Sequence, residues 1–203
     1  MYLYEHATWN PLSGLDDDTQ KRAGTLVLYA RPSDAKRNKK VVWSVDTSDG
    51  RREYEKALHK HLAAEKIVPD KGTTYEPMTS SGDIARLARD TFENLVLIVH
   101  SAGDAPAIAV DLASGDWLKD EAIGKVLAPL AYNRVTVLGC DAVENKFAPR
   151  LAARLPKNST VVGHQGGAFI INRHFEPHKK IRGRFVLTHV SSNFKLKAFK
   201  GQQ

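Results

Sequence analysis

The sequence predicts a three-layer α/β/α sandwich, a mostly parallel sheet between two layers of helices. Short apolar runs rich in β-branched residues indicate buried strands, and segments with apolar residues at helical spacing alternate with them. This alternation is typical of strand–helix–strand units, whose strands run parallel. A length of 203 residues suits one domain of this kind.

The first third of the chain is predicted to hold an irregular arm, two strands and a helix. Residues 1–23 contain proline, glycine and an acidic run, which favours an arm that precedes the domain at 24–203. Thr25–Ala30 and Val41–Val45 are apolar and β-rich, so each is expected to be a buried strand. An amphipathic helix is expected over Arg51–Lys66, where three apolar residues recur at helical spacing: Tyr54, Leu58 and Leu62.

The middle of the chain continues the alternation. Pro69–Thr79 is predicted to be a loop, and Ser80 or Ser81 is predicted to cap a short helix that buries Ile84, Leu87 and Ala88. Leu95–Val99, sequence LVLIV, is expected to be a fully buried strand that ends at His100. A short extended piece is predicted over Ala107–Val110.

The last third is predicted to complete the sheet and to add an antiparallel extension. Asp116–Ala131 is expected to be mostly helical and to end or kink at Pro129, and Val135–Leu138 to be another buried strand. Glu144–Leu155 is helical in pattern, with a regular part that starts late because of Pro149. A strand over Thr160–Gly163 follows, and the β-rich residues at about 167–200 are expected to form a flap.

Composition excludes several classes of protein. The longest apolar runs are about five residues, too short for a membrane-spanning helix. A single cysteine excludes an intramolecular disulfide and zinc sites built on several cysteines, and no metal site is predicted. The first residues lack the basic start and apolar stretch of a signal peptide, so we expect a cytoplasmic protein or one exported without a cleavable signal.

Positive charge is concentrated near the end of the chain. The formal net charge is +7, and no Asp or Glu occurs after Glu176. The flap could therefore bind a polyphosphate, whereas the alternative is a solvated edge strand protected by lysines; nucleic acid is not expected as a partner. The residues concerned are Lys179, Lys180, Arg182, Arg184, Lys195, Lys197 and Lys200.

Two chemically reactive side chains directly follow buried strands. His100 follows LVLIV, and Cys140 follows VTVLG. Ligands of open α/β sheets bind beyond the carboxyl ends of the strands, so two neighbouring strands would bring these residues into one cleft. A thiolate can attack a carbonyl carbon while an imidazole supplies a proton to the leaving amine. The small residues beside them, Ser101, Gly103 and Gly139, would let a substrate approach the backbone.

The segments LVLIVHSAGD, VTVLGCDAVENKFAPRLAARLP and STVVG together resemble the core of the caspase-like (clan CD) cysteine peptidases. Within that superfamily the chain is most similar to the self-cleaving cysteine protease domains of large bacterial toxins and to the CHAT-domain proteases. The resemblance implies a cysteine endopeptidase that cleaves a protein or peptide, acting on its own precursor or as a bacterial effector or toxin. It implies His100 as the catalytic histidine and Cys140 as the nucleophile, with no cofactor required.

The resemblance also implies roles for residues around this pair. The backbone N–H of Cys140 would form half of an oxyanion hole. The other half comes in the family from a glycine after the histidine, where this chain has Ser101, so Ser101 or Gly103 would supply that N–H. Asp46 is a candidate to orient His100, or alternatively a turn residue. Inositol hexakisphosphate, which activates the toxin protease domains, would bind the basic flap.

Two alternatives remain open at the level of sequence. A degenerate relative without activity would serve as a caspase-like module that binds a partner. A serine hydrolase would use Ser101 as nucleophile, with His164 or His189 and Asp141 as partners, because VHSAG resembles the G-x-S-x-G motif. That motif requires a helix directly after the serine, whereas AIAVDL alternates like a strand.

Overall fold

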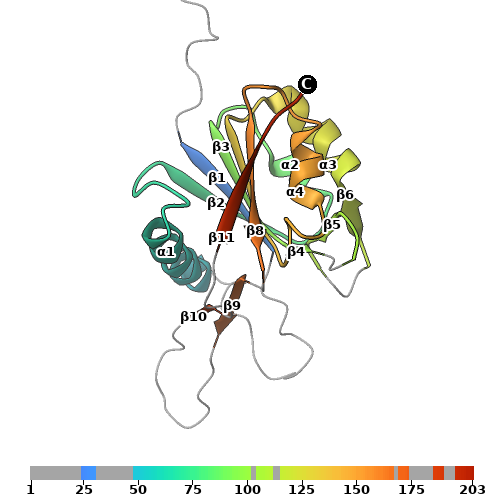
Figure 1. Cartoon of the computed structure of the whole chain (residues 1–203). Helices are drawn as coiled ribbons and strands as arrows, with labels where there is room; N and C mark the ends of the chain where they lie inside the picture. Colours follow the sequence, from blue (N-terminus) through green and yellow to red (C-terminus); the bar gives the residue numbers. More distant parts are fainter. Residues whose placement is uncertain are drawn as a thin grey trace, which may run out of the picture.

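The structure is a computed structural model that describes residues 24–30, 48–101, 104–111, 115–166, 169–173, 185–189 and 195–203. Its centre is a six-stranded sheet in the order β11-β8-β7-β3-β1-β2 (Figure 1). Neighbouring strands run parallel except β11, which is antiparallel to β8. The strands are β1 (Thr25–Ala30), β2 (Thr73–Met78), β3 (Asn94–Ile98), β7 (Arg134–Leu138), β8 (Thr160–Gln165) and β11 (Lys195–Lys200).

Helices cover both faces of this sheet. On one face, α1 (Ser48–Ala64) buries Tyr54, Leu58 and Leu62 against β1 and β3. On the other face lie α2 (Asp83–Leu87), α3 (Asp120–Leu127) and α4 (Phe147–Ala152), with a short 3-10 helix at Ala128–Leu130 after α3 (Figure 1). The described residues thus form an α/β sandwich around a mostly parallel sheet, as the sequence predicted.

Two smaller sheets extend the central one. β4 (His100–Ser101), β5 (Ala107–Ala109) and β6 (Trp117–Lys119) form an antiparallel sheet that begins where β3 ends. β9 (Phe169–Arg173) and β10 (Phe185–His189) form an antiparallel pair. With β11, they confirm that the end of the chain is β-rich and antiparallel within the described ranges. The predicted arm at 1–23 and the predicted strand at Val41–Val45 lie outside the described residues.

Four of the predicted buried strands are present as β1, β3, β7 and β8, but the prediction of a loop over Pro69–Thr79 was wrong. Thr73–Met78 is β2, the edge strand beside β1. Pro77 stands inside this strand opposite Tyr29. Proline has no backbone N–H to donate to a neighbouring strand. A central strand has neighbours on both sides, whereas an edge strand has one and therefore tolerates proline. Part of the predicted helix at Asp116–Ala131 was also wrong, since Trp117–Lys119 pairs with β5 and the helix begins at Asp120.

The predicted serine cap of α2 was wrong as well. Gly82 stands at the N-cap, and no side chain caps the helix there. Instead, the Asp83 carboxylate accepts hydrogen bonds from the backbone N–H and hydroxyl of Thr79, at 2.8 and 2.9 Å. Burial of Asp83 raises its pKa, but these bonds and one from Arg86 outweigh it and lower the pKa to about 2. Ser81 donates its hydroxyl to the backbone carbonyl of Asp116.

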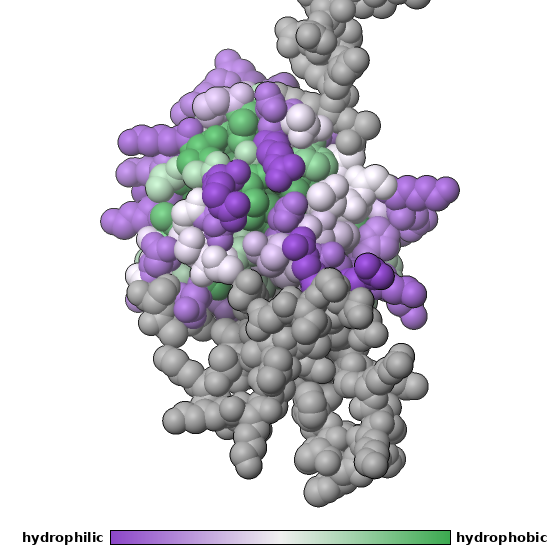
Figure 2. Space-filling model, turned by 180° about the vertical axis from the view of Figure 1, so that it is seen from behind, coloured by the Kyte–Doolittle hydropathy of each residue, from purple (hydrophilic) through white to green (hydrophobic). Residues whose placement is uncertain are grey.

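The surface of the described residues separates polar from apolar side chains. Figure 2 shows hydrophilic side chains around much of the visible rim, with an apolar area between them. Among the described residues, Trp117 is the one large hydrophobic side chain that is exposed. None of the described helices combines the length and the apolar character needed to cross a membrane.

Candidate active site

His100 and Cys140 follow two strands that are hydrogen-bonded neighbours. β3 and β7 are parallel and in register, with Ile98 opposite Leu138. One step further along, the N–H of Val99 donates to the carbonyl of Leu138 at 3.1 Å, so the pairing continues one residue beyond β3. Neighbouring strands lie about 4.8 Å apart. His100 comes two residues after Ile98, and Cys140 comes two residues after Leu138. The fold therefore brings the two residues to adjacent positions at one edge of the sheet.

The alternation of side chains indicates where His100 points. Val99 packs into the core on the side of α2, α3 and α4, whereas Ile98 and Leu138 pack on the side of α1. Because side chains alternate along a strand, His100 in β4 projects to the α1 side, while Cys140 lies in the turn that follows Gly139. Both are half-buried. A half-buried position is suited to a group that must meet a substrate while remaining partly shielded from water.

The chain leaves Cys140 through a tight turn that is bonded to β8. Asp141 has a φ of +52°, a left-handed conformation that Asp tolerates better than most residues. The Asp141 N–H donates to the carbonyl of Gly166 at 3.1 Å, and the Val143 N–H donates to the carbonyl of His164 at 3.2 Å. The Asp141 N–H is thereby occupied and does not serve as a donor to a ligand at this edge.

A second bridge joins this turn to the strand that carries His100. The amide Nδ2 of Asn145 donates to the hydroxyl of Ser101 at 2.6 Å, and its Oδ1 accepts the N–H of Phe147 at 2.9 Å. Gly139 leaves room for the bridge, because a Cβ there would lie 3.0 Å from the Cβ of Ser101. Sequence reasoning did not identify Asn145, because its partner is 44 residues away.

Electrostatics keep both reactive groups in their neutral forms. Burial lowers the pKa of His100, and the negative charge of Asp111 acts in the opposite direction. Burial raises the pKa of the Cys140 thiol, the charge of Asp141 raises it further, and the residue's own N–H lowers it. These directions favour a neutral thiol beside a neutral imidazole, rather than a preformed pair of ions.

A buried histidine stands beside the same edge of the sheet. His164 on β8 is 1% exposed, and its Nδ1 lies 3.3 Å from the carbonyl oxygen of Gly139, to which it donates. Sequence reasoning considered His164 only as a partner for Ser101. In the structure Ser101 lies in β4, paired with Ile108 of another strand, and no helix begins directly after it among the described residues. This topology contradicts the strand–serine–helix arrangement that the serine-hydrolase alternative requires.

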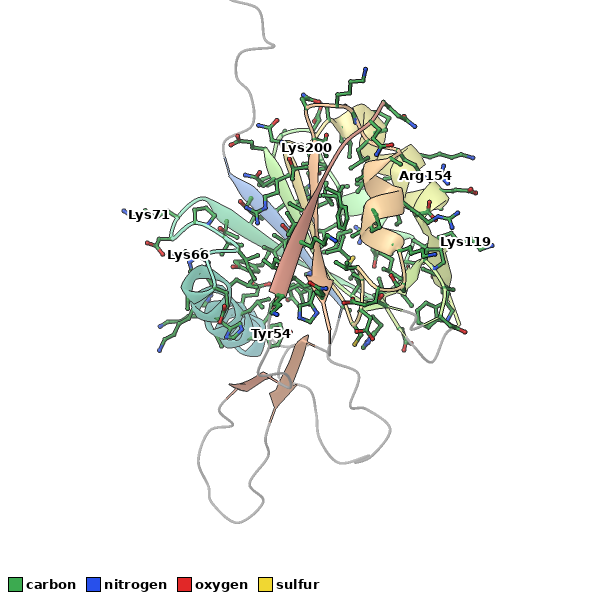
Figure 3. All side chains as sticks on the ribbon, viewed as in Figure 1. Tyr54, Lys66, Lys71, Lys119, Arg154 and Lys200 are labelled. Atoms are coloured by element: carbon green, nitrogen blue, oxygen red, sulfur yellow. The ribbon has the colours of Figure 1, made fainter. Side chains whose placement is uncertain are left out.

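The described lysines of the predicted basic cluster do not gather at one place. β11 runs antiparallel to β8, so Lys195 stands opposite Gln165 near the candidate site, whereas Lys200 stands opposite Thr160 at the far edge. Five steps along a strand separate Lys195 from Lys200 by about 17 Å. Lys200 donates to the Thr160 hydroxyl at 3.0 Å, and Figure 3 shows it toward the opposite end of the sheet from Tyr54.

Several predicted residues lie outside the described part of the chain: Asp46, Gly103, Lys179, Lys180, Arg182 and Arg184. Within the described residues, no group of three or more His, Cys, Asp or Glu side chains is placed to hold a metal ion. No family model, curated protein or solved structure matches the chain. The geometry of the strand ends is therefore the feature of the molecule that bears on function.

Proposed function

We propose that the chain is a cysteine endopeptidase of caspase-like type, with Cys140 as nucleophile and His100 as acid and base. The observation that supports this most is the in-register pairing of β3 and β7, which delivers both residues to one edge of the sheet. In parallel α/β sheets this edge is where ligands bind. The substrate would be a protein or peptide, and the reaction requires no cofactor.

The neutral state of the pair determines the order of the chemical steps. The ring nitrogen of His100 accepts the thiol proton as Sγ of Cys140 attacks the carbonyl carbon of the peptide bond. The carbonyl oxygen becomes an oxyanion, which the N–H of Cys140 and a donor from Ser101 or Gly103 would stabilise. The imidazolium then gives its proton to the leaving amine as the C–N bond breaks. Water hydrolyses the resulting thioester and regenerates the thiol.

A thiol-directed peptide probe tests this proposal. We expect a peptide acyloxymethyl ketone to label Cys140 of the folded chain much faster than it labels the same thiol in urea, as located by mass spectrometry. His100→Ala should reduce the labelling rate by roughly 100-fold or more, because the base is lost. His59→Ala is the matched control, since His59 contacts Tyr75 and Asp70 on the β2 side of the sheet.

The same measurement separates a peptidase from a caspase-like module without activity. A binding module would show labelling of Cys140 that is equally slow in the folded and unfolded chain and that ignores His100→Ala. Cys140→Ala should remove labelling and peptide cleavage together. It should leave the unfolding temperature within a few degrees of wild type, since only one half-buried sulfur is lost.

A further inference from the structure

The strand that follows β3 gives His100 a second neighbour. β4 pairs with β5 in antiparallel fashion, and His100 stands directly opposite Ala109. Residues opposite each other on neighbouring strands project to the same face, and so does the residue two positions further along. Asp111 follows Ala109 by two positions. Asp111 thus takes the diagonal position from His100, directly after the end of β5.

Burial of the residues between them supports this assignment. Ile108 and Val110 are 1% and 3% exposed and pack into the core with α2, α3 and α4. Ala109 and Asp111 alternate with them and therefore project to the other face, which is the one His100 occupies. Asp111 itself is half-buried, as His100 is. A carboxylate in this position is partly shielded from water, so its charge acts on a neighbour more strongly than an exposed one.

Among the charged groups near His100, Asp111 has the electrostatic effect expected of a partner. The titratable groups on the neighbouring elements are Cys140 and Asp141 after β7, His164 on β8 and Lys119 on β6. Of these and the nearby acids, the charge of Asp111 is the one that raises the pKa of His100, against the effect of burial. The charge of Asp141 acts on Cys140 instead.

We propose that Asp111 is the positioning residue for His100, the acid that holds the imidazole in place and stabilises it once it is protonated. This inference rests on the proposed peptidase function. In the first step the proton passes from Sγ of Cys140 to one ring nitrogen of His100. The ring becomes a cation, and Asp111 compensates that charge from the opposite strand. Asp111 takes the part that the sequence suggested for Asp46, and it takes no proton itself.

The test combines an NMR titration with a pH–rate profile. We expect Asp111→Asn to lower the pKa of His100, followed through its ring signals, which the His100→Gln spectrum identifies. The acidic limb of kcat/KM should move to lower pH, because a neutral imidazole then persists further into acid. The maximal kcat/KM should fall by roughly 10-fold to 100-fold, less than the loss from removing the histidine.

Matched variants keep the test decisive. Asp104→Asn removes an exposed carboxylate from the same segment and should leave both the titration and the rate unchanged. Asp111→Glu keeps the charge and should restore most of the His100 titration, while Asp111→Ser replaces Asp111→Asn if that variant does not fold. An unchanged His100 pKa in Asp111→Asn would overturn the inference. If the chain has no peptidase activity, the titration still decides whether Asp111 governs His100, so the two failures are distinct.

Discussion

At the edge of the sheet where the parallel strands begin, backbone hydrogen bonds connect one loop to the next. The carbonyl of Gly24 accepts the N–H of Glu93, Asn133 donates its N–H to Glu93, and Thr160 donates its N–H to Asn133. The opposite edge, where the strands end, carries three titratable side chains at or after the ends of the neighbouring strands β3, β7 and β8: His100, Cys140 and His164. Both edges satisfy backbone polar groups in this way, and the edge where the strands end also carries a thiol and two imidazoles.

This difference suggests that one edge of the sheet contributes mainly to stability and the other mainly to chemistry. Changes at the starting edge should lower the free energy of unfolding and leave the chemistry of the folded molecules intact. Changes at the ending edge should alter reactivity at a smaller cost in stability. Glycines and polar bridges occur at both edges, so matched substitutions can test whether the division holds.

The largest effect on stability is expected for Gly24→Ala at the starting edge. Gly24 has a φ of +113°, and a Cβ there would lie 2.5 Å from the carbonyl oxygen of Gly72, which accepts the N–H of Thr25. Strain and overpacking together should cost about 3–5 kcal/mol, measured by urea unfolding.

Gly166→Ala at the ending edge is the control. Its φ is +86°, and none of the described atoms lies within 4 Å of a Cβ there, so it should cost about 1–2 kcal/mol. Equal costs would refute the asymmetry.

A smaller effect is expected for Asn145→Ala at the ending edge. The substitution removes the donor to Ser101 and leaves the buried N–H of Phe147 without the Asn145 Oδ1, so unfolding should become easier by about 2–3 kcal/mol. It should also slow probe labelling of Cys140, because the turn after Cys140 loses its tie to β4. Ser101→Ala removes only one of the two bonds and should cost about 1 kcal/mol. A labelling rate that does not change in either variant would show that the bridge is purely structural.

The central strands of the sheet could be predicted from the sequence, whereas the edge strand β2 could not. The runs TLVLYA, LVLIV and VTVL are almost entirely apolar because β1, β3 and β7 are covered on both faces. β2 has one strand neighbour and mixed burial, so TTYEPM lacks that signal, and Pro77 argues against a strand. A pattern that depends on full burial identifies central strands and misses a partly exposed one.

The candidate site divides in the same way. The position of His100 and Cys140 after two neighbouring strands could be predicted, because each directly follows a recognisable strand and parallel strands end at one edge. Asp111 could not, because its position depends on the pairing of β4 with β5, and β4 is only two residues long. The local sequence does not indicate such a short strand pairing. The hydrogen bond between Asn145 and Ser101 could not be predicted either, because the two residues are 44 positions apart.

The smallest effect expected concerns the lysines of β11, and it tests whether the ending edge also attracts anions. Lys195 and Lys197 are exposed and share one face of β11, and the Nζ of Lys197 lies 5.6 Å from the centre of the Phe199 ring. If this strand contributes to a polyphosphate site, inositol hexakisphosphate at low salt should raise the unfolding temperature of the wild-type chain. Replacing Lys195 and Lys197 by Gln should reduce that shift, and added salt should reduce it too, because exposed charges are screened. Lys200→Gln is the control, because Lys200 lies at the starting edge beside Thr160 and should leave the shift unchanged. Equal losses from both changes would mean that net charge, rather than a site at the ending edge, governs the binding.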